Sequence, residues 1–330
     1  MKIKKEASFY RQLEDGWVQC DLCPHACRIP AGTKGKCGIR KNEEGRLFSL
    51  NYGKITAYCI DPIEKKPLYH FYPGSRIFSI GSTGCNFTCQ FCQNWHIAQE
   101  DPEGIYTTAE NIINIAQNEK NNIGIAFTYN EPTIWFEFVR EVAKKVKPVG
   151  LKSVLVTNGF ISEASLEALL PYADAMNIDL KSFDENFYRQ ICGGQRSPVL
   201  QTIRKAQAAC HIEITFLLVN GFNDSREEVE EMAKWISEIS PDIPLHLSRY
   251  YPAYQMDQEP TPIDRMLEAK EAAKGHLRYV YMGNMPPGAD KNTYCPQCSE
   301  TIVNREKKVT VENLVNNRCR RCGEEIAIIL

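Results

Sequence analysis

Regular alternation of apolar runs and amphipathic segments is the feature that most constrains the fold of this 330-residue chain. Between residues 76 and 282, short runs typical of buried strands alternate with segments of helical periodicity. This order predicts right-handed βαβ units around a parallel sheet. Six or so repeats favour an α/β fold, a partial (βα)6 TIM-like barrel, over a complete eightfold barrel. The predicted strands are 76–81, 123–127, 153–157, 176–180, 213–219, 245–249 and 278–282.

Cysteine-rich segments on both sides of the predicted barrel divide the chain into three parts. We expect an N-terminal Cys-rich module with a flap at 1–75, the barrel at 76–288 and a four-cysteine knuckle module at 289–330. A Pro-rich stretch before the first barrel strand carries Lys65, Lys66, Tyr69 and His70. It is either a flap over the substrate or a linker that packs the N-terminal module on the barrel.

Composition excludes several classes of protein. The net charge is −2 and the pI is near 6.3, so there is no strong nucleic-acid signal. No run approaches the roughly 20 apolar residues of a membrane span, and no apolar run follows the basic start, as a signal peptide would require. Eleven of the fourteen cysteines fall in tight groups, which indicates metal ligation in a reducing, cytoplasmic setting. The three outside these groups, Cys59, Cys192 and Cys210, are expected to be small buried hydrophobic residues.

Three central cysteines, Cys85, Cys89 and Cys92, follow the first predicted strand with the spacing Cys-x3-Cys-x2-Cys. Three thiolates on one loop can hold three irons of a [4Fe–4S] cluster and leave the fourth iron open to a small chelating molecule. A zinc site that lacks one ligand, or a set of buried thiols, is the alternative. In TIM-like barrels the active site lies at the carboxyl ends of the strands, which is where the loop with these cysteines begins.

Two further groups of cysteines lie near the ends of the chain. The C-terminal group forms two Cys-x2-Cys knuckles, and this spacing predicts a zinc-ribbon-like module. Its zinc site would staple a tail too short for its own core: Cys295, Cys298, Cys319 and Cys322. The N-terminal group has the spacing Cys-x2-Cys-x3-Cys-x9-Cys, which matches neither the usual spacing of a zinc site nor that of an iron–sulfur cluster. We favour zinc there, with an auxiliary iron–sulfur cluster as the alternative, at Cys20, Cys23, Cys27 and Cys37.

The central motif, with Phe91 between its last two cysteines and Asn94 after them, resembles that of the radical SAM superfamily. Residues 76–282 are similar to the activating-enzyme branch, typified by pyruvate formate-lyase activase. In that branch the chelating molecule is S-adenosylmethionine (SAM). The resemblance implies these cofactor-binding residues: Asn94, Tyr129, Asn130, Glu131, Thr157, Asn158, Asp179 and Lys181.

Within that set, the resemblance assigns individual roles. Glu131 would accept the SAM ammonium group, Lys181 would bind the SAM carboxylate, and Asp179 with Thr157 would hold a monovalent cation. Tyr129 and Asn130 replace two glycines of the family's Gly-Gly-Glu-Pro motif. The backbone there is therefore expected to approach the cofactor less freely. No side chain is assigned a catalytic role.

The N-terminal cysteines, the stretch 61–74 and the terminal knuckles together resemble radical SAM enzymes of the AmmeMemoRadiSam system. That resemblance implies Memo-family and AMMECR-type proteins as partners and a flavodoxin- or ferredoxin-like electron donor. The implied reaction is reductive cleavage of SAM to methionine and a 5′-deoxyadenosyl radical, which abstracts hydrogen from a small molecule, protein or RNA.

Two other classes of function stay open. One is a zinc-scaffolded module that binds a partner or RNA without SAM chemistry, and the other is an electron-transfer protein that uses clusters alone. The sequence leaves open the substrate, the reductant, the oligomeric state and whether SAM is consumed or regenerated.

Overall fold

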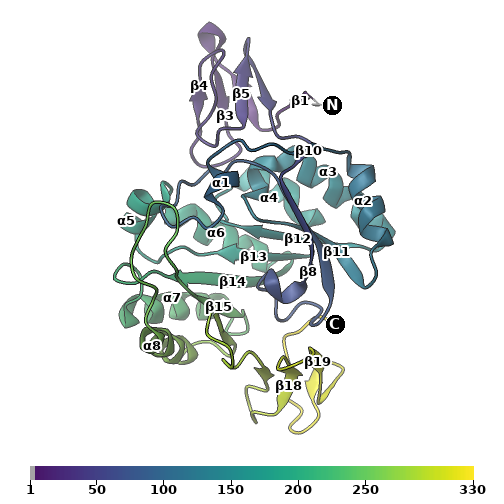
Figure 1. Ribbon diagram of the computed structural model, residues 1–330, viewed down its shortest axis with the longest axis vertical. Helices are drawn as coiled ribbons and strands as arrows, with labels where there is room; N and C mark the ends of the chain where they lie inside the picture. The colour runs from purple at the N-terminus through teal and green to yellow at the C-terminus, as the bar shows by residue number, and fades with distance from the viewer. Residues whose placement is uncertain (1–3) are drawn as a thin grey trace.

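A curved eight-stranded sheet forms the centre of the computed structural model, which describes residues 4–330 (Figure 1). Its strands are β8 (Ala57–Pro62), β9 (Arg76–Gly81), β11 (Asn122–Phe127), β12 (Lys152–Thr157), β13 (Ala175–Asp179), β14 (His211–Leu218), β15 (Leu245–Arg249) and β16 (Val280–Gly283). Their order in the sheet is β16-β15-β14-β13-β12-β11-β9-β8. All neighbours are parallel except β8, which runs antiparallel to β9.

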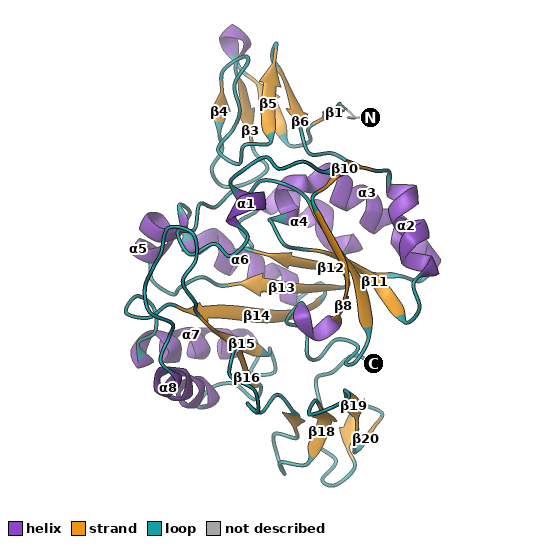
Figure 2. Ribbon diagram, viewed as in Figure 1, coloured by secondary structure: helices purple, strands orange, loops and turns teal. Residues whose placement is uncertain are grey.

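Helices connect the parallel strands and pack along one face of the sheet (Figure 2). They are α1 (Trp95–Ala98), α2 (Ala109–Asn118), α3 (Phe136–Val146), α4 (Glu163–Leu169), α5 (Glu185–Phe187), α6 (Arg196–Gln207), α7 (Arg226–Ile239) and α8 (Ile263–Lys274). In the described residues, six strand–helix units are followed by the seventh parallel strand, β16. The α/β prediction is confirmed, but the sheet stays open between its edges β8 and β16, so the barrel is not closed.

Local sequence explains where these elements begin and which face they bury. Thr108 caps α2 by accepting a hydrogen bond from the Asn111 backbone, as its position before the helix predicts. In α3, Val139, Val142 and Val146 recur at helical spacing and are fully buried against the sheet. No helix of the described chain is long and apolar enough to cross a membrane.

Two small β modules lie at opposite ends of the long axis of the molecule (Figure 1). The N-terminal one contains β1 (Lys5–Glu6), β2 (Tyr10–Gln12), β3 (Val18–Cys20), β4 (Arg28–Ile29), β5 (Arg40–Glu43) and β6 (Arg46–Ser49), while β7 (Lys54–Ile55) pairs with β10 (Ile105–Tyr106). The C-terminal one contains β17 (Thr293–Tyr294), β18 (Thr301–Asn304), β19 (Thr310–Val311), β20 (Leu314–Val315) and β21 (Arg318–Cys319). The boundary at residue 75 stays a prediction, although β8, on its N-terminal side, pairs with β9.

Candidate cofactor site

A cavity of about 350 Å³ opens at the carboxyl ends of β9, β11, β12 and β13. Parallel strands bring the loops that follow them to one edge of the sheet, so residues far apart in sequence meet there. The cavity gathers the central cysteines and seven of the eight residues implied by the resemblance: Cys85, Cys89, Cys92, Asn94, Tyr129, Asn130, Glu131, Asn158, Asp179 and Lys181. Thr157 is the exception, since it does not line the cavity and reaches it only through its hydrogen bond to Glu131.

The loop that carries the central thiols is pinned to a π-helical turn at Tyr188–Cys192. The backbone N–H groups of Thr88 and Gln90 donate to carbonyls of this turn at 2.8 and 3.0 Å. Burial raises the pKa of Cys85 and Cys92, so binding a metal requires these thiols to lose their protons. The pKa of Cys89 is raised by a hydrogen bond with the buried Cys192 thiol and by burial.

Glu131 is buried, and its carboxylate joins the second and third loops of the site. Oε1 accepts from the Thr133 backbone at 2.9 Å and from the Thr157 hydroxyl at 2.7 Å. Oε2 accepts from the Asn158 backbone at 2.7 Å. Burial raises the pKa of Glu131. The structure therefore gives this carboxylate a positioning role, and its contact with a SAM ammonium group stays a prediction.

The two residues that replace glycines behave differently from each other. Tyr129 has φ +71°, the left-handed conformation that glycine adopts most easily. Tyr129 holds this conformation at a strain cost on the order of 1 kcal/mol. Asn130 instead binds the cluster loop, because its amide accepts from Ser82 N–H and donates to the Gly84 carbonyl, both at 3.0 Å.

Two asparagines anchor the loops nearest the thiols. The side-chain amide of Asn94 donates to the Tyr129 carbonyl at 2.8 Å. The amide of Asn158 donates to the side chain of Asn86 at 2.8 Å and lies 3.7 Å from the sulfur of Cys85. Asn86 was missed by the sequence analysis, since nothing in its local sequence separates it from any other turn residue.

Lys181 and Asp179 form an ion pair in the cavity wall, with 2.8 Å between Nζ and Oδ2. Although burial opposes the charge, the neighbouring Asp179 carboxylate raises the pKa of Lys181, which keeps its positive charge. The Thr157 hydroxyl is bonded to Glu131 and Asp179 is paired with Lys181. Their predicted joint cation site stays a prediction.

The stretch between β8 and β9 lines the cavity at one end and packs on the C-terminal module at the other. Lys65 and Lys66 line the cavity, and Lys66 pairs with Asp61 at 2.7 Å. The Tyr69 and His70 side chains are buried on the other side, among residues of the sheet and the C-terminal module. Neither predicted role is thereby established: a flap over the substrate stays a prediction, and the contacts made here are with the C-terminal module and not with the N-terminal one.

The four C-terminal cysteines form a compact group. Among the described residues, they are the set whose sulfur atoms all lie within 4.8 Å of one another, including contacts of 3.5 Å for Cys295–Cys322 and 3.7 Å for Cys298–Cys319. Four thiolates bound to one zinc ion by 2.3 Å bonds stand about 3.8 Å apart. The geometry is therefore that of a metal site, and zinc remains the predicted ion.

The four N-terminal cysteines also meet, around one small buried cavity that Arg40 and Ile134 help to line. Burial raises the pKa of Cys20 to about 11 and that of Cys23 to about 12. Thiols in such surroundings stay protonated at neutral pH unless a metal displaces the protons.

Comparison with known proteins agrees with this geometry. The sequence model of the Radical SAM superfamily matches residues 79–236. An uncharacterised protein of Methanocaldococcus jannaschii is 39% identical over 336 residues, covering 99% of this chain and 100% of that protein. The chain belongs to the radical SAM superfamily, whose members use a [4Fe–4S] cluster and SAM.

More distant relatives include activating enzymes. A pyruvate formate-lyase-activating enzyme from Clostridium pasteurianum is 23% identical over 165 residues, covering 47% of this chain and 67% of the enzyme. The fold is similar to that of Streptococcus suis SuiB bound to precursor peptide SuiA, with TM-score 0.52 and 16% identity over 67% of this chain and 51% of that one. This last likeness concerns the fold alone.

Proposed function

We propose that the chain is an activase-like radical SAM enzyme that cleaves SAM reductively to methionine and a 5′-deoxyadenosyl radical, which removes a hydrogen atom from a substrate. One observation carries the proposal: a single cavity holds the three central thiols together with Glu131 and Lys181. Its size lies within the range of ordinary small-molecule sites.

Residues of this chain would bind and orient the cofactors. Cys85, Cys89 and Cys92 would each bind one iron, and the cluster would supply the electron that breaks a carbon–sulfur bond of SAM. Lys181 carries the positive charge suited to the SAM carboxylate. The Glu131 carboxylate holds its neighbouring loops in place and presents negative charge to an ammonium group.

The activating-enzyme relatives suggest only a class of substrate. In the activase-like reading the hydrogen comes from a backbone glycine of a partner enzyme. If the chain instead belongs to the AmmeMemoRadiSam system, as its terminal segments suggest, Memo-family and AMMECR-type proteins are partners and the substrate is a small molecule, protein or RNA. A flavodoxin- or ferredoxin-like protein would supply the electron, and the cytoplasm is the proposed location.

The first test is SAM cleavage without a substrate. Wild-type protein loaded anaerobically with iron and sulfide, and then reduced, is expected to release 5′-deoxyadenosine. Cys89→Ala should release less than about one hundredth as much, because one iron loses its ligand. Cys210→Ala is the matched control, since Cys210 lies outside the cavity. Equal product from wild type and Cys89→Ala would sink the proposal, as would a wild-type protein that binds no iron.

The hydrogen donor can then be identified with deuterated candidates. Turnover with a deuterated partner protein or small molecule should place deuterium in the recovered 5′-deoxyadenosine. A candidate that transfers none is not the donor.

A further inference from the structure

The four N-terminal cysteines surround a cavity and do not converge on one point. They line one small cavity of about 10 Å³. Sulfur atoms bound to a single zinc ion would stand about 3.8 Å apart and leave no such space between them. We call this set, Cys20, Cys23, Cys27 and Cys37, the N-terminal cage.

The spacing of the sulfur atoms can be compared with that in the other two cysteine groups of the chain. The C-terminal thiols meet closely enough for one ion, with sulfur contacts of 3.5 and 3.7 Å. In the part of the chain that the structure describes, neither the N-terminal cage nor the central trio contains three sulfur atoms that all lie within 4.8 Å of one another. Wide spacing suits a cluster, in which each thiolate binds a different iron. The cage therefore resembles the central trio more than the zinc-like knuckles.

A buried cation faces the cage. Arg40 is 1% exposed, and one of its terminal nitrogens donates to Glu137 at 2.8 Å. Its Nε–H is buried without a hydrogen-bond partner. Because Arg40 lines the cage, this donor suits a sulfur of an anionic group held there.

The cage packs directly on the loop of the central cysteines. His25, between two cage cysteines, lies 2.7 Å from the Asn86 carbonyl through its Nε2. A Cβ added to Gly84, which precedes Cys85, would lie 2.9 Å from the Cys37 carbonyl oxygen, so the two segments touch. The glycine is required here both by this contact and by its φ of +91°.

We propose that the N-terminal cage holds a second iron–sulfur cluster, which relays electrons to the central cluster. A low-potential one-electron donor protein would reduce the cage cluster, and the cage cluster would then reduce the central one. Each transfer oxidises the donor and reduces the acceptor by one electron, with no bond made or broken. The relay rests on the proposed function, whereas the identity of the cage cofactor does not.

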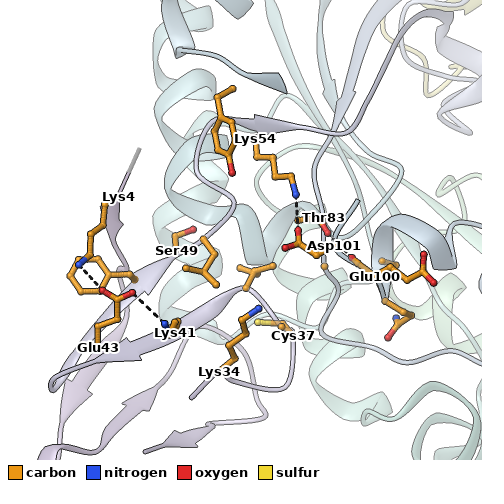
Figure 3. Close-up of a pocket in the computed structure, with 18 residues that line it drawn as sticks. Lys4, Lys34, Cys37, Lys41, Glu43, Ser49, Lys54, Thr83, Glu100 and Asp101 are labelled. Carbon is orange, nitrogen blue, oxygen red and sulfur yellow. Dashed lines mark hydrogen bonds and ion pairs between the residues drawn. The ribbon is translucent and has the colours of Figure 1, made fainter. Parts of the chain in front are cut away.

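An opening for the donor adjoins both the cage and the start of the central loop. Cys37 is part of the wall of a cavity of about 570 Å³ between the N-terminal module and the barrel (Figure 3). Lys34 and Lys41 line the same cavity. Cys37 lines this opening and no central cysteine does, so a donor bound there would reach the cage first.

The cage is tested in a variant without the central thiols, Cys85→Ala/Cys89→Ala/Cys92→Ala. After anaerobic loading with iron and sulfide, this variant should retain iron, sulfide and a reduced-state EPR signal that added SAM does not change. Adding Cys20→Ser/Cys23→Ser should abolish that signal, while adding Cys295→Ser/Cys298→Ser should not. Zinc in the cage and no iron in the triple variant would overturn the proposal, and this outcome leaves SAM cleavage by the wild type unaffected.

The relay needs a second measurement in the otherwise intact chain. Cys20→Ser/Cys23→Ser should keep the central cluster and its SAM-dependent EPR change, yet reduction of that cluster by ferredoxin or flavodoxin should slow by about tenfold or more. A small reductant such as dithionite should reduce it with a smaller loss. An unchanged rate with the protein donor would show that the cage is not on the electron path.

Discussion

Lys181 illustrates how single residues set the chemistry of the cavity. It is paired with Asp179, is partly shielded from water and retains its charge. Replacing it by methionine keeps the length of the side chain but removes the cation from the cavity wall. A hydrogen bond to a charged group contributes about 1.5–3 kcal/mol, so SAM affinity of Lys181→Met should fall about tenfold to a hundredfold.

The measurement is SAM titration followed by the EPR signal of the reduced central cluster. Lys205→Met is the matched control, because Lys205 forms ion pairs with Glu163 and Glu167 on the surface. Iron content should be unchanged in both variants. Full SAM affinity in Lys181→Met would mean that this lysine serves its partner Asp179 and not the cofactor.

At the scale of elements, the turn after α5 fixes the loop of the central cysteines. A Cβ added to Gly194 would lie 2.1 Å from the buried ring of Phe87, which sits between Cys85 and Cys89. The ring must therefore move in Gly194→Ala, and overpacking of this kind costs about 1–3 kcal/mol. We expect lower iron retention at the central site and a lower melting temperature.

Gly283→Ala is the control for that variant. A Cβ at Gly283 meets its nearest neighbour at an ordinary 3.5 Å, and neither glycine needs a positive φ. Iron content and melting temperature of the control should match the wild type. If Gly194→Ala also matched it, the turn would not be what positions the loop.

The same elements show what could be predicted from sequence. Strand periodicity predicted that the loops after β11, β12 and β13 meet at one edge, and the resemblance to activating enzymes singled out Glu131, Asn158 and Lys181 within them. The turn that holds the central loop could not be foreseen, because its contacts join residues about a hundred positions apart. Of the three single cysteines expected to be buried, Cys192 is buried and also adjoins Cys89, whereas Cys210 is half-buried. The expectation was wrong for Cys59, which is exposed on the edge strand β8.

At the scale of the whole molecule, the C-terminal module is docked on the same stretch that forms a wall of the cavity. His70 lies between Ala327 and Tyr281, at 2.6 Å from the carbonyl oxygen of one and the hydroxyl of the other. The backbone of Ile329 donates to the His70 carbonyl at 2.8 Å. Lys66, which lines the cofactor cavity, lies four residues before His70. Loss of the His70 contacts would therefore displace part of the cavity wall.

Low pH should weaken the contact between this stretch and the C-terminal module, because His70 becomes protonated on unfolding. Burial lowers the pKa of His70 from 6.5 to about 4, so the folded chain holds the ring neutral. Unfolded chains take up a proton below pH 6.5, so stability is complete above that value and falls as pH drops towards 4, by roughly 3 kcal/mol. Urea unfolding of wild type and His70→Gln across this range should show the loss in the wild type alone. Glu213, whose two histidine partners outweigh burial and lower its pKa, should lose its own contribution at more acidic pH. A drop of equal size in His70→Gln between pH 6.5 and 4 would assign the acid sensitivity to other groups.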